Sequence, residues 1–384
     1  MKAAVLGYGT VGAGVYSMLS DAPGMEAGPV LVRPGKAVES FMVSDAALIF
    51  GDPTVDAVVE TLGGLDPAYS YGMRALEAGK HFITANKAMV TAHGLELAAL
   101  AREKGAAFLF SAACGGGVPF LHNLALSAET DRIEAVSGIL NGTTNYMLDA
   151  MQRRSLSYGD ALREAQSLGY AESDPTADVS GLDALRKMQL ACAVAFGVLP
   201  QSGMLCEGME HFTAADVEDI QSRGLVCRLM ARGSRAGESV SAYVEPVLFP
   251  HAAPESSVFT NNNMARYTGK RCGSIVLMGQ GAGRFPTASA VLRDLAAAQQ
   301  GARSMFPENC RAAEADNREA VHSYYIRTGG FAAVRLSLRS VLAQGEVVRA
   351  VTEPMSAEKM HALAQNIRKD GNDLFFAALE EELC

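Results

Sequence analysis

A glycine motif between a strand and a helix constrains the fold of this chain more than any other feature. The apolar run from Lys2 to Leu6 leads into GYGTVG at residues 7–12, and apolar residues then recur at helical spacing as far as Leu19. This is GxGxxG in the strand–turn–helix context that dinucleotide binding requires. An ordinary glycine-rich turn is the alternative. The context favours a dinucleotide site formed by Gly7, Gly9, Thr10, Val11 and Gly12.

Strand-like and helical segments keep alternating after this motif. Short apolar runs lie at residues 57–62, 81–84 and 107–110, and a helical pattern covers about 93–104. This alternation predicts a Rossmann-type α/β domain with a parallel sheet and helices on both faces. The carboxyl ends of such strands face the ligand, so Lys87 is placed to meet a substrate carboxylate or carbonyl oxygen. A surface lysine without a ligand remains the alternative.

The end of the second predicted strand indicates which nicotinamide cofactor is used. An acidic residue there would bond the adenosine ribose hydroxyls and repel a 2′-phosphate. Residues 30–36 contain no acid, and they carry Arg33 and Lys36 instead. The sequence therefore favours NADP over NAD, unless both cations are only solvated loop residues.

The pattern changes after Pro119. A strand-like run at 133–140 precedes a long helical stretch, strand-like runs return at 240–248, 264–271 and 274–278, and a helix follows at about 288–300. A charged stretch at 303–318 is typical of a linker, and the last residues alternate as strand 322–328, helix 331–343, strand 346–352 and helix 356–368. We expect a Rossmann domain that covers residues 1–130 plus 284–302. An α+β domain is expected at 131–283, and a small βαβα module at 319–384.

Composition excludes several functional classes. The net charge of −9 disfavours a nucleic-acid binder, which would carry a basic face, and no apolar run is long enough for a membrane span. The N-terminal residues do not form a secretory signal. The seven cysteines are scattered and form no CxxC pair, which argues against a disulfide framework or a zinc site. A reducing cytoplasm is the expected location.

An acid-rich segment, GYAESDPTADVSGLDALRK at 169–187, offers a candidate site for a cationic group. Asp183 and Lys187 are four residues apart and so share one helix face, and Glu172, Asp174 and Asp178 lie just before them. Four acids around one lysine leave a surplus of negative charge, which suits an ammonium ligand. The alternative is a solvated helix entrance with an exposed ion pair worth a few tenths of a kcal/mol.

Several blocks together resemble homoserine dehydrogenase. They are GYGTVG at 7–12, TANKAMV at 84–90, CGGGVPF at 114–120, GILNGTTNYML at 138–148, the acid-rich segment at 169–187 and GQGAGRFPTASAVLRDL at 279–295. The blocks occur in the family's order and span about residues 1–300. The resemblance implies an NAD(P)-dependent enzyme of threonine, methionine and isoleucine biosynthesis that interconverts L-homoserine and L-aspartate 4-semialdehyde, and it suggests a homodimer formed through the second domain.

The resemblance also implies a role for each matching residue. Lys187 is expected as the acid/base group at the reacting oxygen, Lys87 as a second lysine near substrate and nicotinamide, and Asp178 as an acid that orients the lysine. Glu172 and Asp183 would hold the substrate's amino group. Further contacts are expected from Thr143 at the substrate and from Thr61, Gly169 and Gly283 at the cofactor.

The sequence departs from the family in two places. A glutamate that helps to bind sodium in the family is replaced by Ser111, so a cation held by the backbone carbonyls of Cys114, Gly116 and Val118 is in doubt. The C-terminal module stands where many members carry an ACT regulatory domain, but its motif is divergent. Two alternatives follow: a related dehydrogenase for another amino-acid semialdehyde, or a catalytically weak NADP-binding paralogue with a regulatory role.

Overall fold

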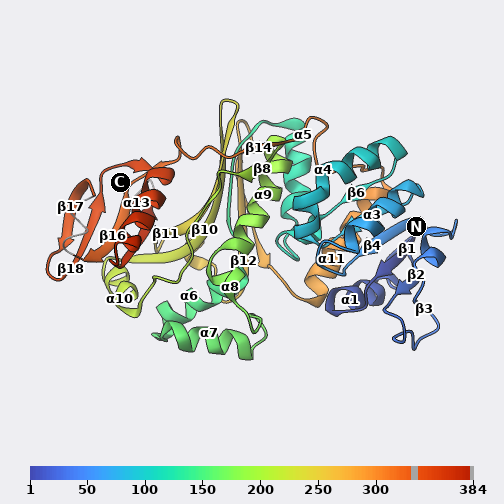
Figure 1. Cartoon of the computed structure of the whole chain (residues 1–384), viewed down its shortest axis with the longest axis horizontal. Coiled ribbons are helices and arrows are strands. Elements are labelled where there is room, and N and C mark those ends of the chain that lie inside the picture. Colours follow the sequence, from blue (N-terminus) through green and yellow to red (C-terminus); the bar gives the residue numbers. More distant parts are fainter. Residues whose placement is uncertain (330–335, 381–384) are drawn as a thin grey trace. The chain divides into compact units, whose positions relative to one another are not determined.

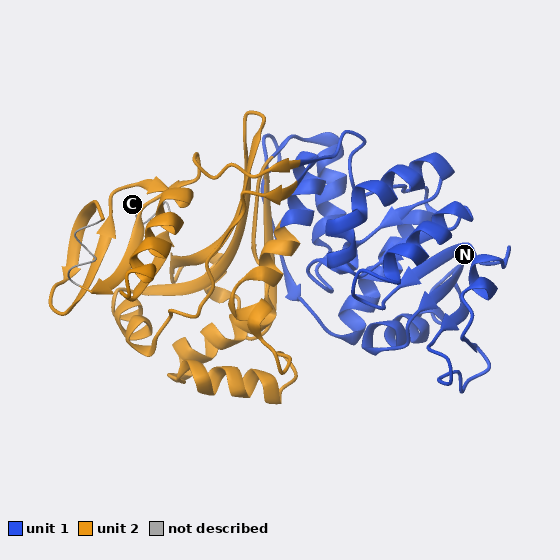
Figure 2. Cartoon of the chain, viewed as in Figure 1, with its two compact units in different colours: residues 1–133, 189–199, 269–312 blue, residues 134–188, 200–268, 313–384 orange. Residues whose placement is uncertain are grey.

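The computed structural model describes residues 1–329 and 336–380 of the chain. They form two compact units, each assembled from segments that are distant in sequence (Figure 2). Unit 1 comprises residues 1–133, 189–199 and 269–312, and unit 2 comprises residues 134–188, 200–268 and 313–384. The helix α9 (Leu182–Phe196) and the strands β8 (Val198–Ser202) and β14 (Arg311–Glu314) have residues in both units, and the first residue of β7 (Ile133–Ile139) and the last of β12 (Asn262–Gly269) fall in unit 1.

Unit 1 contains a six-stranded sheet in the order β3-β2-β1-β4-β5-β6, and all its neighbouring strands are parallel (Figure 1). This is the Rossmann order, and the predicted parallel α/β domain is confirmed. The central strands are apolar and buried along nearly their whole length, as strands covered on both faces must be. The strands are β1 (Lys2–Leu6), β2 (Glu26–Leu31), β3 (Met42–Val43), β4 (Ala57–Glu60), β5 (His81–Thr84) and β6 (Phe108–Leu109).

Helices connect these strands and cover the sheet. Gly14 of the first helix lies against the last one, since a Cβ at Gly14 would be 2.9 Å from Cγ of Arg284. The later segment 269–312 thereby completes the unit with a helix that packs on the nucleotide-turn helix. The remaining elements of unit 1 are α1 (Thr10–Leu19), α2 (Ala47–Phe50), α3 (Ala68–Glu77), α4 (Lys87–Lys104), η1 (Ser111–Ala113), α5 (Phe120–Thr130), β13 (Gly273–Gln280) and α11 (Arg284–Gln299).

The charged stretch after α11 is not the linker that the sequence predicted. Met305 and Phe306 are buried, and the ring of Phe306 packs 4.8 Å from that of Phe110. The backbone N–H of Phe108 also donates to the carbonyl oxygen of Arg303 (2.7 Å). Two apolar side chains therefore anchor this segment to the Rossmann sheet despite its polar surroundings.

Unit 2 is an α+β structure around a mostly antiparallel sheet. Within it the strand order is β12-β7-β10-β11-β20-β16-β18-β17, and β9 pairs with β11. Strands β10 and β11 form a long hairpin, in which the pairing runs from Leu225 opposite Pro250 to Ala236 opposite Ser239. The elements are β7 (Ile133–Ile139), α6 (Gly142–Arg154), α7 (Tyr158–Ser167), α8 (Thr176–Val179), β9 (Leu205–Cys206), α10 (Ala214–Ser222), β10 (Leu225–Ala236), β11 (Ser239–Pro250), η2 (Pro254–Ser257) and β12 (Asn262–Gly269).

The C-terminal residues extend this same sheet. β20 pairs in parallel with β11 and antiparallel with β16, and Met360, Ala364 and Ile367 of α13 pack into the core beneath them. The described residues from 319 onwards belong to unit 2 and do not form a compact unit of their own. The elements are β15 (Val321–His322), β16 (Tyr324–Gly329), β17 (Leu338–Ala343), β18 (Val347–Thr352), β19 (Met355–Ser356), α13 (Ala357–Lys369) and β20 (Leu374–Leu379).

The helix predicted over 331–343 is wrong for residues 338–343, which form strand β17. This strand pairs antiparallel with β18, to which it is joined by a short turn that contains Gly345. The spacing of the apolar residues in this segment suits a helix as well as a strand. Pairing with the neighbouring strand β18 decides in favour of a strand. Residues 331–335 of the predicted helix lie outside the described residues.

Candidate functional site

The GYGTVG turn has the geometry of a phosphate-binding turn. Gly7 has a φ of +97°, and its N–H donates to the carbonyl oxygen of Leu31 (3.0 Å). A Cβ at Gly12 would lie 2.1 Å from the carbonyl oxygen of Gly7, so only glycine fits there, whereas a Cβ at Gly9 would meet no atom within 4 Å. The turn thus leaves space above Gly9 at the start of α1. The unpaired N–H groups of a helix N-terminus attract anions at such a position.

The other predicted cofactor residues of unit 1 lie on loops that follow strands. Thr61 follows β4. Its hydroxyl donates to the carbonyl oxygen of Leu6 (2.9 Å), so Thr61 helps to fix the end of β1 where the GYGTVG turn begins. Arg33 is exposed just beyond β2, and Lys36 is exposed on the same loop. Gly283 has a φ of +120° and directly precedes α11. All these positions are compatible with the predicted contacts, which remain predictions.

A buried carboxylate that the sequence reading missed organises the ends of β4 and β5. Glu60 is fully buried, and it accepts hydrogen bonds from the hydroxyl of Thr84 (2.5 Å) and from the N–H of Leu62 (2.6 Å). The Thr84 hydroxyl accepts from the N–H of Asn86, whose side chain caps α4. Lys87 is the first residue of that helix. An acid at the end of an otherwise apolar strand was the signal that could have found Glu60.

In unit 2 three of the predicted site residues are gathered around one amide. The side chain of Asn141 is buried, and its Nδ2 donates to Asp178 (2.7 Å) and to Asp183 (2.9 Å). Asp183 forms an ion pair with Lys187 (2.7 Å), whose Nζ also donates to the carbonyl oxygen of Leu140 (2.6 Å). The side chains of Asp183 and Lys187 are only 13% and 12% exposed, so this is not the solvated pair of a helix surface.

Asn141 has a second role that explains why it is placed so firmly. Its Oδ1 accepts the N–H of Thr144 (2.8 Å) and so caps α6, while its Nδ2 holds the two acids. The sequence reading included Asn141 in a matching block but assigned it no role. Its position as an N-cap directly after a strand was the available signal.

Burial raises the pKa of one acid of this cluster, Asp178. Desolvation raises the pKa of Asp178, a nearby negative charge on Asp183 adds to the rise, and the hydrogen bonds from Asn141 and Thr143 together with the charge of Lys187 oppose it. Thr143 is buried, and its single hydroxyl proton is shared between Asp178 and the carbonyl oxygen of Tyr170, which lies 2.5 Å away. Thr143 thereby ties the start of α6 to the loop that precedes α8.

Two further predicted residues, Glu172 and Gly169, lie on the loop between α7 and α8. The side chain of Glu172 is exposed, and its backbone carbonyl oxygen accepts a hydrogen bond from the side chain of Gln166 (3.1 Å). Gly169 has a φ of +75° at the end of α7. Asp174 caps the turn before α8 by accepting from the N–H of Thr176 (3.1 Å), as expected for an Asp-Pro turn.

The glycine-rich loop of unit 1 offers little to a metal ion. The carbonyl oxygen of Val118 accepts the N–H of Phe120 (2.8 Å), and the Ser111 hydroxyl faces the sulfur of Met305 (3.9 Å). No group of three or more His, Cys, Asp or Glu side chains suited to a metal occurs in the described part of the chain. A monovalent cation at this loop would depend on backbone oxygens such as those of Cys114 and Gly116.

Beside this loop lies a buried acid whose titration should be visible in stability. Asp294 of α11 is completely buried, accepts the N–H of Ser111 (2.8 Å), and has its pKa raised by burial to about 7. The folded protein therefore holds this proton more tightly than the unfolded chain does. The resulting stabilisation is present at acidic pH and is lost as the pH rises towards 7.

We expect Asp294→Asn to remove this pH dependence. Relative to the variant, the wild type should lose up to about 4 kcal/mol of unfolding free energy between pH 4 and pH 8, since one pKa unit corresponds to about 1.4 kcal/mol. Denaturant unfolding of both proteins across this range measures the difference. Parallel stability profiles would show that Asp294 does not titrate there.

Comparisons with known proteins identify the family of the chain. The family model for the NAD-binding domain of homoserine dehydrogenase matches residues 7–111, and the model for homoserine dehydrogenase matches residues 119–296. The chain is 38% identical over 316 residues to a homoserine dehydrogenase of Corynebacterium glutamicum, covering 77% of this chain and 71% of the relative. It is 34% identical to that of Bacillus subtilis, covering 79% and 74%.

A solved structure extends the likeness through the C-terminal residues. The homoserine dehydrogenase of Thiobacillus denitrificans matches with a TM-score of 0.88 and 28% identity, covering 99% of this chain and 98% of that one. No helix in the described ranges is long and apolar enough to cross a membrane. The chain belongs to the homoserine dehydrogenase family, whose members are NAD(P)-dependent oxidoreductases that act on a CH–OH group.

Proposed function

We propose that the Asn141-centred cluster of unit 2 is where this homoserine dehydrogenase moves the proton of its reaction, the interconversion of L-homoserine and L-aspartate 4-semialdehyde. The observation that carries the proposal is the nearly buried ion pair of Lys187 and Asp183, fixed by Asn141. A lysine held among acids and a backbone carbonyl has a defined direction, which an acid/base group requires.

The bound nicotinamide cofactor supplies or accepts the hydride. In the reducing direction Lys187, as an ammonium, donates a hydrogen bond to the aldehyde oxygen and then its proton to the alkoxide that develops there. In the oxidising direction the neutral amine of Lys187 takes the hydroxyl proton. Asn141 and Leu140 keep the side chains of this cluster in place throughout.

The acids bind the amino group of the substrate in this proposal. Asp183 is shared between Lys187 and the substrate ammonium, and Glu172 meets the same ammonium from its exposed loop. Asp178 is a positioning residue, because it is bonded to Asn141 and is adjacent to Thr143. Thr143 is assigned to substrate binding, and Lys87 keeps the role that the family resemblance implies, a second lysine near substrate and nicotinamide.

We further propose that NADP is the preferred cofactor. The exposed Arg33 and Lys36 after β2 would meet a 2′-phosphate, and the stretch 30–36 has no acid to repel it. Family resemblance also supports a homodimer. A sodium ion is not included, because Ser111 supplies no carboxylate.

Homoserine-dependent reduction of NADP and of NAD tests these assignments. We expect turnover, with kcat/KM higher for NADP, and Arg33→Ala should raise KM for NADP about tenfold, consistent with the loss of one charge-assisted contact, while KM for NAD changes little. No turnover with either cofactor would contradict the proposed function. Equal losses for NADP and NAD in the variant would contradict the role of Arg33 alone.

A further inference from the structure

A loop of unit 2 lies between the candidate substrate cluster and the C-terminal elements. This loop, residues 206–213, runs from the last residue of β9 to the residue that caps α10. It contains Cys206, Glu207, Gly208, Met209 and Phe212, and none of these residues belongs to the site predicted from sequence.

One side of the 206–213 loop is in direct contact with α8, the short helix that carries Asp178. The N–H of Met209 donates to the carbonyl oxygen of Val179 (2.9 Å). The thiol of Cys206 donates to the carbonyl oxygen of Ser180 (3.0 Å). A Cβ at Gly208 would lie 2.2 Å from the Val179 oxygen. The two backbones therefore touch, and the loop cannot move without moving the end of α8.

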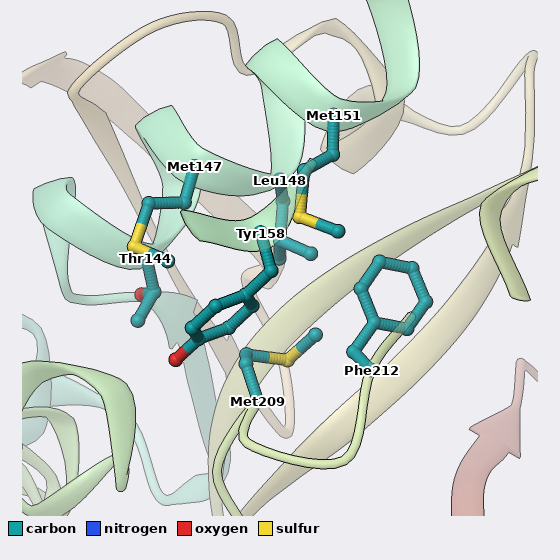
Figure 3. Close-up of a pocket in the computed structure, with 7 residues that line it drawn as sticks. All are labelled: Thr144, Met147, Leu148, Met151, Tyr158, Met209 and Phe212. Carbon is teal, nitrogen blue, oxygen red and sulfur yellow. The ribbon is translucent and has the colours of Figure 1, made fainter. Parts of the chain in front are cut away.

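The loop also supports α6, the helix capped by Asn141. Met209 and Phe212 are each only 2% exposed, and with Tyr158 they face Met147, Leu148 and Met151 of α6 across an apolar pocket (Figure 3). The loop thus contacts both elements whose side chains form the Asn141–Asp178 hydrogen bond.

The other side of the loop is held by two arginines from the C-terminal elements. Arg368 of α13 forms a two-pronged ion pair with the nearly buried Glu207 (2.7 and 2.9 Å), and it donates to the carbonyl oxygen of Leu374 (2.7 Å) as well. Arg327 of β16 donates to the carbonyl oxygen of His211 (2.8 Å) and pairs with Asp216 (2.7 Å) at the start of α10. Paired hydrogen bonds of this kind fix direction as well as distance.

We propose that Glu207 and Arg368 are positioning residues of the substrate site. Their ion pair fixes the 206–213 loop, and the loop in turn holds α8 and α6 in place. The hydrogen bond between Asn141 and Asp178 is thereby kept, and with it the orientation of the Asp183 and Lys187 side chains. The C-terminal elements are then a structural part of the active site. This inference depends on the proposed function only for its kinetic consequence.

The kinetic test compares Arg368→Gln and Glu207→Gln with the wild type. We expect kcat for homoserine oxidation to fall and KM for homoserine to rise, by about tenfold to 100-fold in kcat/KM, because a small misplacement of reacting groups is costly. Affinity for NADPH, measured by fluorescence titration, should stay unchanged because the nucleotide turn is in unit 1. Arg318→Gln, which removes an exposed ion pair with Asp316 in the same unit, is the matched control and should have wild-type kinetics.

The conservative Arg368→Lys variant, which keeps the charge but not the two-pronged geometry, should recover part of the lost kcat/KM. Folded variants with unchanged NADPH affinity and wild-type kcat and KM would overturn the inference. If the wild type itself fails to turn over homoserine, the proposed function falls instead.

Hydrogen exchange gives a second readout that does not need turnover. In Arg368→Gln the backbone amides of residues 178–181 and of Met209 should exchange faster, while those of α1 in unit 1 should not change. Equal exchange at residues 178–181 in variant and wild type would overturn the inference whether or not homoserine is a substrate.

Discussion

Replacing Lys187 by alanine should abolish nearly all turnover while leaving the protein folded and able to bind NADPH. We expect kcat to fall on the order of 10³-fold, the scale of a lost acid/base group, in both directions of the reaction. The Lys187 ammonium is held by Asp183 and by the Leu140 carbonyl oxygen, and no other lysine side chain of unit 2 is part of this cluster in the described residues. Steady-state kinetics gives kcat, and fluorescence titration gives the NADPH affinity.

Arg186→Ala is the matched control for this experiment. Arg186 is the preceding residue of α9, but its side chain is exposed, so its removal should leave kcat within about twofold of the wild type, as expected for a substitution on the surface. If Lys187→Ala keeps wild-type kcat, another group transfers the proton and the proposed mechanism is wrong.

Adding one methyl group to the nucleotide turn should separate cofactor binding from folding. At Gly9 a Cβ would meet no atom of the protein within 4 Å, and the φ of −76° suits any residue. Gly9→Ala should therefore keep the wild-type free energy of unfolding. The methyl group would occupy the space that a pyrophosphate needs above the helix N-terminus, so affinity for NADPH should fall at least about tenfold, or about 1.4 kcal/mol.

Gly12→Ala provides the contrast, because its Cβ would lie 2.1 Å from the Gly7 carbonyl oxygen and 2.7 Å from the Thr61 hydroxyl. The turn must shift, so we expect loss of about 1–3 kcal/mol of stability as well as loss of affinity. Thermal unfolding and NADPH titration of both variants measure the two effects. Unchanged NADPH affinity in Gly9→Ala would place the pyrophosphate elsewhere.

The parts of the fold that were predictable from sequence are those whose signals are local. The strand–glycine–helix pattern and the buried apolar runs sufficed for the Rossmann sheet, since each strand is covered on both faces and has few polar residues. The β17 segment could not be assigned in this way. Its apolar spacing fits a helix as well as a strand, and pairing with β18 decides between them.

The candidate site was predictable in its charged residues but not in its organisation. Asp183 and Lys187 stand four residues apart on a helix, a spacing that sequence reveals directly. Asn141 joins them to Asp178 across about forty residues of chain, and Glu207 supports them from further along the sequence. Such contacts depend on how α6, α8 and the 206–213 loop pack, which no local pattern encodes.

The central claim is that Lys187 accepts the hydroxyl proton when homoserine is oxidised, and the pH dependence of wild-type kcat tests it most directly. A protonated lysine must lose its proton before it can act as a base, so homoserine oxidation should become faster from neutral to alkaline pH. Saturating NADP and homoserine isolate this step from binding. An increase in kcat across that range is the predicted result, and a flat profile would contradict Lys187 as the base.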